Sequence, residues 1–186
     1  MLSPKQKILG TVTIAIAVLV ALFFALNSYI YSEKQGDDLP ADFKEILFTM
    51  SGEPVSLAGG VGQVTTTLGG GGMSTVRYFG NEVTQDVDGN GTEDAVFLVT
   101  QETADGSVFF YAVAALKSDG GYTGSHAVLL GKDIAPQTTE KGEGRSVVVN
   151  YAIAGDPSAG KSIRLLLDPV TLELGEVVQD FEGESR

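Results

Sequence analysis

Residues 95–100 read A-V-F-L-V-T and residues 108–113 read V-F-F-Y-A-V, and these two stretches decide the fold class. Both are rich in β-branched and aromatic residues, which favour strands. Their side chains are apolar at successive positions, so both faces of each strand must be covered. Because a single open sheet leaves one face in water, we expect a mainly β domain, an antiparallel β-sandwich or a barrel-like fold.

Shorter patterns on either side of these stretches raise the expected number of strands to seven to nine. Alternating polarity bounded by turn residues predicts strands at residues 45–50, 54–57, 74–83, 122–130, 146–152, 163–167 and 173–178. The sequence Ala104-Asp105-Gly106 between the two central strands indicates a hairpin turn. Seven glycines in residues 59–73 predict a flexible surface loop, with one short strand at residues 63–66.

The N-terminal part of the chain has a different composition. Residues 8–26 contain neither a charge nor a Pro, and a helix rising ~1.5 Å per residue over them nearly crosses a hydrocarbon core of ~30 Å. Tyr29 and Tyr31 follow where an interfacial aromatic belt lies, so we expect a transmembrane anchor over residues 8–31. The alternative is a cleaved signal peptide, although the apolar region of such peptides is normally only ~7–15 residues long.

The charges around this span predict its orientation. Lys5 and Lys7 precede it and all 24 acidic residues follow it, so the positive-inside rule keeps the N-terminus in the cytoplasm. The expected organisation is a cytoplasmic N-terminus (1–7), a transmembrane anchor (8–31), a linker (32–44) and an extracytoplasmic β-domain (45–186). A type IV pilin-like leader would be cleaved after Gly10, but the fifth mature residue would then be Ala15, where such families carry Glu.

The composition excludes several classes of protein. The chain has 186 residues with 24 acidic and 12 basic side chains, a formal net charge of −12. An acidic chain of this kind does not bind nucleic acid, because the phosphate backbone requires Lys and Arg. The absence of Cys excludes disulfides and thiolate metal sites. With 43% hydrophobic residues and a mean hydropathy of +0.14, the chain is not a disordered acidic tail either.

One loop has the chemistry of an ion site. Residues 86–94 read D-V-D-G-N-G-T-E-D, with oxygen-bearing side chains at positions 1, 3, 5 and 9 and Gly at position 6. The candidate ligands are the side chains of Asp86, Asp88, Asn90 and Asp94 and the carbonyl of Thr92. This spacing is that of EF-hand loops, whose Ca²⁺ takes 6–8 oxygen ligands. Position 12 is Phe97 instead of the bidentate Glu, so a helix-loop-helix hand is excluded. Because exported calcium modules bind weakly, we expect a Kd of about 10⁻⁴–10⁻³ M.

A turn that binds nothing is the alternative, because Asp, Asn and Gly favour turns in any case. The loop also resembles the calcium loops of FG-GAP propeller repeats and dockerins. It occurs once in the chain, which does not support a propeller built from such repeats.

Two further features of the sequence are candidates for functional sites. Residues 155–162 fit the P-loop pattern G-x-x-x-x-G-K-S, but a strand-like pattern ended by Pro169 follows instead of a helix. We therefore expect an exposed loop there and no nucleotide. His126 is the single histidine and no G-x-S-x-G nucleophile motif accompanies it, so we expect a surface or half-buried structural residue.

The chain resembles an uncharacterised family of exported, membrane-anchored bacterial proteins that is well represented in candidate phyla. The resemblance covers most of residues 54–153 and depends on R-Y-F-G-N-E at 77–82, D-G-N-G-T-E-D at 88–94 and I-A-P-Q-T-T at 134–139. It implies a bacterial extracytoplasmic β-domain without an established activity. Family members often carry Asp at the position of Asn90, so the resemblance implies one ligand charge fewer in this chain.

These observations predict a single-pass, membrane-anchored β-domain with a structural calcium loop, acting as a binding or structural module. Its ligand, a protein or another envelope component, is not identified by the sequence. The alternatives are an envelope hydrolase and a pilin-like surface subunit, and the sequence favours a protein that is not an enzyme.

Overall fold

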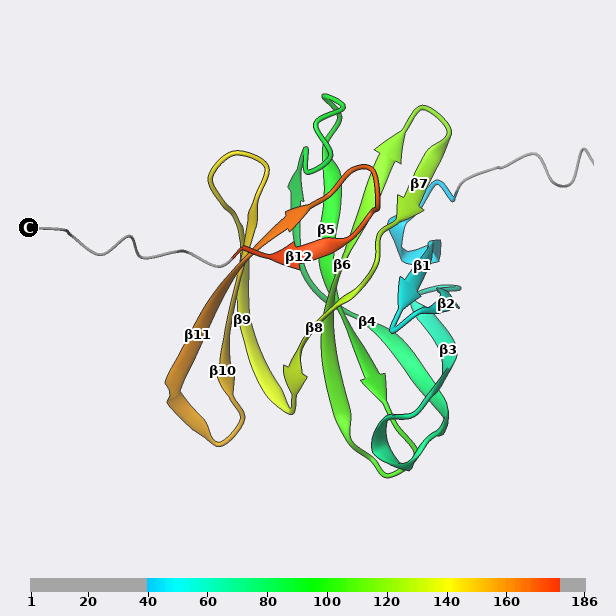
Figure 1. Ribbon diagram of the computed structural model, residues 1–186, viewed down its shortest axis with the longest axis vertical. Helices are drawn as coiled ribbons and strands as arrows, with labels where there is room; N and C mark the ends of the chain where they lie inside the picture. Colours follow the sequence, from blue (N-terminus) through cyan, green and yellow to red (C-terminus); the bar gives the residue numbers. More distant parts are fainter. Residues whose placement is uncertain (1–39, 178–186) are drawn as a thin grey trace, which may run out of the picture. The chain divides into compact units, whose positions relative to one another are not determined.

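The computed structural model describes residues 40–177, which contain twelve strands and two short 3₁₀-helices (Figure 1). The elements are η1 (Phe43–Glu45), β1 (Leu47–Met50), β2 (Glu53–Ser56), β3 (Val61–Thr66), η2 (Leu68–Gly70), β4 (Gly72–Gln85), β5 (Asp94–Glu102), β6 (Val108–Ser118), β7 (Gly121–Gly124), β8 (Val128–Lys132), β9 (Ile134–Lys141), β10 (Val147–Ile153), β11 (Asp156–Leu167) and β12 (Leu174–Glu176). Every pair of these strands is antiparallel, which confirms the predicted mainly β, antiparallel fold.

The predicted transmembrane anchor at residues 8–31 lies outside the described residues. Within residues 40–177, no helix is both long and apolar enough to cross a membrane.

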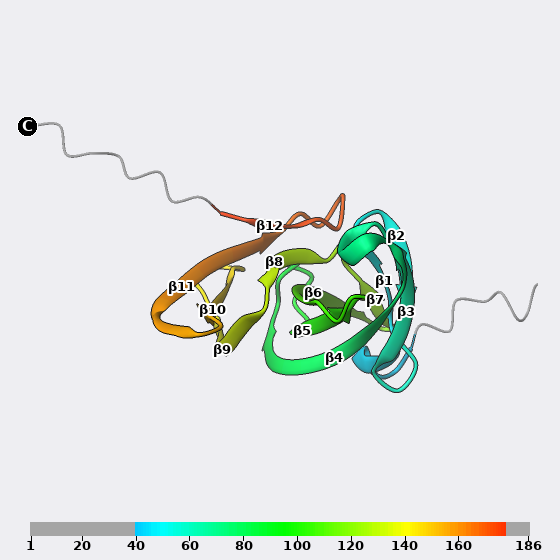
Figure 2. The same ribbon diagram turned by 90° about the horizontal axis from the view of Figure 1, so that it is seen from below.

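The strands form three sheets. The central sheet has the order β3-β4-β5-β6-β7, and β8 pairs with β6 as well. A second sheet has the order β12-β11-β10-β9, and β1 and β2 form a separate hairpin. Seen from below, β3 and β4 curve around β5 and β6 towards β1 and β2, so this side of the domain has the shape of a half-barrel (Figure 2).

The central strands are buried on both faces, as their composition predicts. Val96 and Leu98 of β5 belong to a first core cluster, whereas Phe97 and Val99 belong to a second one. Successive side chains of a strand point to opposite faces, so β5 contributes to both clusters in alternation. The first cluster lies between the central sheet and the second sheet, and the second cluster lies under the β1–β2 hairpin.

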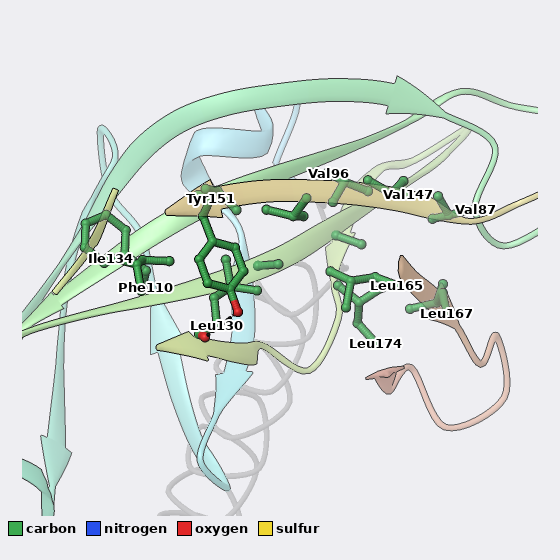
Figure 3. Close-up of a cluster of buried hydrophobic side chains, with 14 of the residues drawn as sticks. Val87, Val96, Phe110, Leu130, Ile134, Val147, Tyr151, Leu165, Leu167 and Leu174 are labelled. Atoms are coloured by element: carbon green, nitrogen blue, oxygen red, sulfur yellow. Dashed lines mark hydrogen bonds between the residues drawn. The ribbon is translucent and has the colours of Figure 1, made fainter. Parts of the chain in front are cut away.

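The first core cluster joins strands that are far apart in the sequence (Figure 3). Val96 and Phe110 of the central sheet share it with Leu165 of β11 and Leu174 of β12. Tyr151 of β10 is also buried there, and its hydroxyl donates a hydrogen bond of 3.2 Å to a backbone carbonyl, that of Leu130. The buried phenol is therefore not left without a polar partner.

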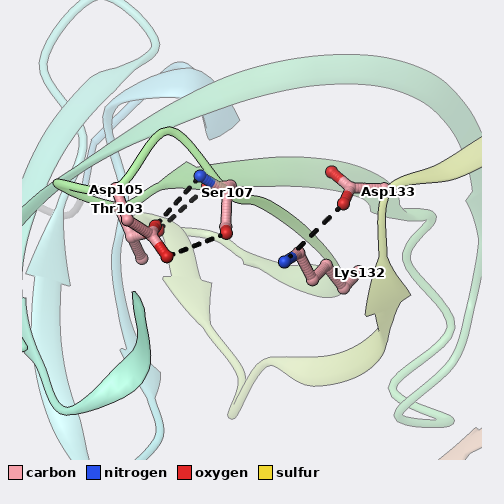
Figure 4. Close-up of polar contacts among 5 residues, drawn as sticks. All are labelled: Thr103, Asp105, Ser107, Lys132 and Asp133. Atoms are coloured by element: carbon pink, nitrogen blue, oxygen red, sulfur yellow. Dashed lines mark hydrogen bonds and ion pairs between the residues drawn. The ribbon is translucent and has the colours of Figure 1, made fainter. Parts of the chain in front are cut away.

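The hairpin turn predicted at Ala104-Asp105-Gly106 connects β5 to β6 (Figure 4). Asp105 is its polar centre: the hydroxyl of Thr103 donates to Oδ1 at 2.6 Å, and the backbone N–H of Ser107 donates to the same oxygen at 3.0 Å. These hydrogen bonds favour the charged form and lower the pKa of Asp105, the bond from Thr103 contributing most.

Twelve strands exceed the expected seven to nine, and β9 is a strand that the sequence pattern did not reveal. Its Pro136 lacks the N–H that a regular ladder requires, which argues against a strand. The pairing of β9 with β10 is shifted next to Pro136, where Asn150 opposes Thr138 and Tyr151 opposes Pro136. The bulge accommodates the Pro, so the strand continues on both sides of it. Similarly, the predicted strand 122–130 is two strands, β7 and β8, separated at residues 125–127.

Two segments expected to be loops are largely strands. In the glycine-rich residues 59–73, β3 confirms the short strand expected at residues 63–66, whereas η2 and the beginning of β4 replace part of the expected loop. Residues 156–162 belong to β11, which pairs with β10 up to the turn at Ala154 and Gly155. Small and polar side chains give these segments a weak strand pattern. They form strands because segments elsewhere in the chain pair with them.

The described structure begins with a segment that packs on the domain. Phe43 of η1 lies 5.5 Å from the ring of Phe97 and 6.0 Å from that of Tyr122, measured between ring centroids. The backbone carbonyl of Pro40 accepts a hydrogen bond from the N–H of Tyr122, at 2.9 Å. The last residues of the expected linker are thus held against the domain.

Candidate metal-binding loop

The loop at residues 86–93 connects β4 to β5 and is shaped by its glycines. Gly89 and Gly91 adopt φ angles of 84° and 89°, in the left-handed region where a side chain is strained. The carboxylate of Asp86 accepts backbone N–H groups from both glycines, at 2.7 and 3.0 Å. The alternation of Asp and Gly therefore folds this loop back on its own first residue.

Three carboxylates meet inside the loop. Asp86, Asp88 and Asp94 each place one oxygen within 4.8 Å of the oxygens of the other two. None of the three forms an ion pair with a Lys or Arg of the described residues. Three like charges at this separation repel one another, and a hard divalent cation with oxygen ligands relieves that repulsion. The donor set therefore fits the cation that the spacing predicts.

Asp94 forms the inner wall of this cluster. Its side chain is fully buried and accepts backbone N–H groups from Val87 at 2.9 Å and from Lys117 at 2.7 Å. Burial raises the pKa of Asp94, and the nearby charge of Asp88 acts in the same direction, while the backbone hydrogen bonds oppose the shift. Hydrogen bonds from the protein backbone alone therefore hold the carboxylate of Asp94 in place.

The side-chain oxygen of Asn90 and the carbonyl of Thr92 were predicted as ligands together with the three carboxylates. The side-chain amide nitrogen of Asn90 donates to Asp88 at 3.0 Å, and its oxygen accepts the backbone N–H of Thr92 at 2.6 Å. The amide nitrogen, not the oxygen, thus faces the carboxylate of Asp88. The structure brings together the three Asp residues of the predicted set, and ligand roles for Asn90 and Thr92 stay predictions.

The loop contacts two distant parts of the chain that the sequence did not associate with it. At the end of β6, the backbone carbonyl of Lys117 accepts a hydrogen bond from the side chain of Asn90, at 2.9 Å. In the β9–β10 turn, the guanidinium of Arg145 donates to the backbone carbonyl of Asp88 at 2.6 Å. Lys141 also pairs with Glu93, at 3.0 Å. Because these partners follow the loop by tens of residues, no local spacing could have indicated them.

The P-loop-like residues 155–162 form a hairpin turn and the start of β11. Lys161 pairs with Tyr151 in the ladder between β10 and β11, and Ser162 pairs with Asn150. A P-loop holds phosphate at the N-terminus of the helix that follows it. Here the strand continues to Leu167.

His126 lies in the short segment between β7 and β8, with an exposed side chain, as expected for a surface residue. Backbone bridges place it between Thr49 and Glu173, and the three residues line a hollow of about 320 Å³. Within residues 40–177, the imidazole makes no hydrogen bond and no ion pair. The hollow therefore contains a histidine and an acidic residue, but the imidazole is not hydrogen-bonded to a nucleophile or to an orienting carboxylate, as nucleophilic catalysis requires.

A second hollow, of about 250 Å³, lies between the β1–β2 turn and the end of β3. Thr65, Thr66 and Ser51 line it, together with the carboxamide of Gln101. Gln101 is almost completely buried and accepts a hydrogen bond from Tyr111 at 2.9 Å. Met50, Val64 and Leu68 complete the lining, so the hollow is of mixed polarity and carries no group with an evident chemical task.

Comparison of the chain with models of known protein families, with curated proteins and with solved structures finds no match. The resemblance to exported bacterial proteins accordingly stays a prediction.

Proposed function

We propose that this protein is a membrane-anchored extracytoplasmic β-domain that carries a structural calcium ion and serves as a binding or structural module. The observation that supports this most directly is the cluster of Asp86, Asp88 and Asp94, three carboxylates within 4.8 Å that form no ion pair with a basic side chain of residues 40–177. These residues would hold the ion. Calcium would supply the positive charge that the cluster lacks and would hold the loop against Asp94, the first residue of β5.

The proposed location fits the proposed affinity. Extracellular calcium modules bind with a Kd of about 10⁻⁴–10⁻³ M, which suits a compartment where the ion is plentiful. The uncharged stretch at residues 8–26 would provide the anchor, and the excess of 24 acidic over 10 basic side chains in residues 32–186 would keep the exported domain soluble. An ion bound this weakly would stabilise the fold without sensing a signal.

Thermal unfolding of the full chain in detergent tests the proposal, in 10 mM calcium and in excess chelator. With the Kd given above, binding to the folded state alone contributes about 1.4–2.7 kcal/mol. For a domain of this size that corresponds to a rise in Tm of about 3–10 °C. Asp88→Ala should abolish the rise.

The matched control is Glu93→Gln, which also removes a carboxylate from the loop. Glu93 pairs with Lys141 and is not one of the three clustered residues, so the calcium-dependent rise should persist in this variant. An unchanged Tm of the parent in calcium would remove the ion from the proposed function. If the two variants responded alike, the calcium effect would not depend specifically on the three clustered aspartates, and the proposed site would be wrong.

An envelope hydrolase is the alternative with some geometric support, because His126 and Glu173 share a hollow. A hydrolase needs a nucleophile hydrogen-bonded to its base, and the imidazole of His126 has no such partner among residues 40–177. We therefore prefer the module. A pilin-like subunit depends on a mature N-terminus at Thr11, which lies outside the described residues.

A further inference from the structure

Gln85, the last residue of β4 and the residue before Asp86 of the carboxylate cluster, has an unsatisfied side-chain oxygen. Its side chain is only 8% exposed, and its amide nitrogen donates to the backbone carbonyl of Gly144 at 2.7 Å. Since that contact requires the nitrogen, it also settles which end of the carboxamide is the oxygen. The oxygen is buried and accepts no hydrogen bond from any of residues 40–177. A buried acceptor of this kind requires an explanation.

The position of Gln85 in the sheet offers an explanation for its unsatisfied oxygen. Gln85 is the partner of Asp94 in the β4–β5 ladder, so the two side chains leave the sheet on the same face. Their Cβ atoms are then about 4.5–5.5 Å apart, within the reach of a Gln side chain. Asp94 is the buried member of the carboxylate cluster. The orphan oxygen thus belongs to the residue that stands next to the candidate cation site.

The loop also lacks a ligand that its spacing requires. Phe97 occupies the position of the bidentate Glu of an EF-hand and is buried in the second core cluster, away from the loop. Calcium takes 6–8 oxygens, so three carboxylates and a backbone carbonyl leave room for another donor. We propose that Gln85 supplies it: the carboxamide oxygen ligates the cation held by the three aspartates. This inference rests on the proposed calcium site and adds a ligand from outside the loop.

Calcium titration of the full chain in detergent, followed by calorimetry, tests the assignment with two variants of one position. Gln85→Leu removes the ligand and should weaken calcium binding by about tenfold or more. Gln85→Glu replaces it with a charged oxygen and should tighten binding relative to the parent, because affinity in such loops rises with ligand charge. Gln63→Glu on β3 adds the same charge to an exposed residue away from the loop and should leave the affinity unchanged.

The sign of the Gln85→Glu effect separates a ligand from a merely structural residue. Both variants lose the amide donor to Gly144, so a structural role predicts weaker calcium binding for both. Weakening in both, or an affinity equal to that of the parent in both, would overturn the assignment. A parent that binds no calcium would instead refute the proposed function itself. Should Gln85→Leu fail to fold, as judged by circular dichroism, the Gln85→Glu affinity decides.

Discussion

Two valines of β5 test whether the central sheet is covered on both faces. Val96 belongs to the first core cluster and Val99 to the second, and each is fully buried. Replacing either by Ala removes two carbon atoms, at about 0.8 kcal/mol each, and leaves a small cavity. We therefore expect each variant to lose about 2–3 kcal/mol of unfolding free energy.

The double variant extends the test. Three residues along a strand separate the two sites by about 10 Å, and the side chains point to opposite faces. Sites so placed and without shared partners are additive within about 0.5 kcal/mol, so the pair should cost about 4–6 kcal/mol. Val170→Ala is the matched control, because Val170 is 88% exposed in the β11–β12 turn and should change stability by no more than about 0.5 kcal/mol.

Equilibrium unfolding in urea, followed by far-UV circular dichroism, measures all four variants. Burial of β5 on both faces would be refuted if one of the two buried variants lost less than about 0.5 kcal/mol while the other lost about 2–3 kcal/mol. That result would mean that one face of β5 is open to solvent, as in a single sheet with one covered side.

Two further predictions concern turns and close contacts. Gly124→Ala would place a Cβ 2.4 Å from the backbone oxygen of Leu47 and should cost at least about 1–3 kcal/mol in the same urea assay. Gly160→Ala has nothing within 4 Å and should be neutral, so equal effects of the two substitutions would contradict the packing described. Asp105 has a lowered pKa, so its contribution to stability is present above the pKa of the unfolded chain and is lost as the pH falls through the folded value. The parent should therefore exceed Asp105→Ala in stability at neutral pH, and the difference should vanish in acid; a difference independent of pH would count against the hydrogen-bonded carboxylate.

The sequence predicted the centre of the fold better than its periphery. Residues 95–99 and 108–113 carry hydrophobic side chains at successive positions, and a strand of that kind has few alternatives to a doubly covered sheet. The strand at residues 134–141 carries polar side chains and a Pro, and it is a strand because β10 pairs with it around a bulge. Pairing between distant segments is a tertiary property, which local composition does not encode.

For the candidate site, too, the sequence predicts one part, and only the fold reveals the other. The three carboxylates come together because their spacing in one loop requires it, and the sequence alone shows that spacing. Arg145 and Lys117 meet the loop only after the sheets have formed. Gln85 could have been noticed as the residue before the loop, but its burial and its orphan oxygen are visible only in the folded chain.

The proposed ion would affect more than one turn, because the loop contacts both of the larger sheets. Arg145 donates to the backbone carbonyl of Asp88 from the β9–β10 turn, which belongs to the second sheet, whereas Asp94 starts a strand of the central sheet. The exposed pair of Lys141 and Glu93 joins the same parts, but such pairs contribute at most about 1 kcal/mol. An ion that draws Asp88 to Asp94 would hold the carbonyl of Asp88 in place for Arg145, and so would strengthen the contact between the two sheets. Chelation would then loosen the edge of the first core cluster at Val87, whose N–H is bound by Asp94.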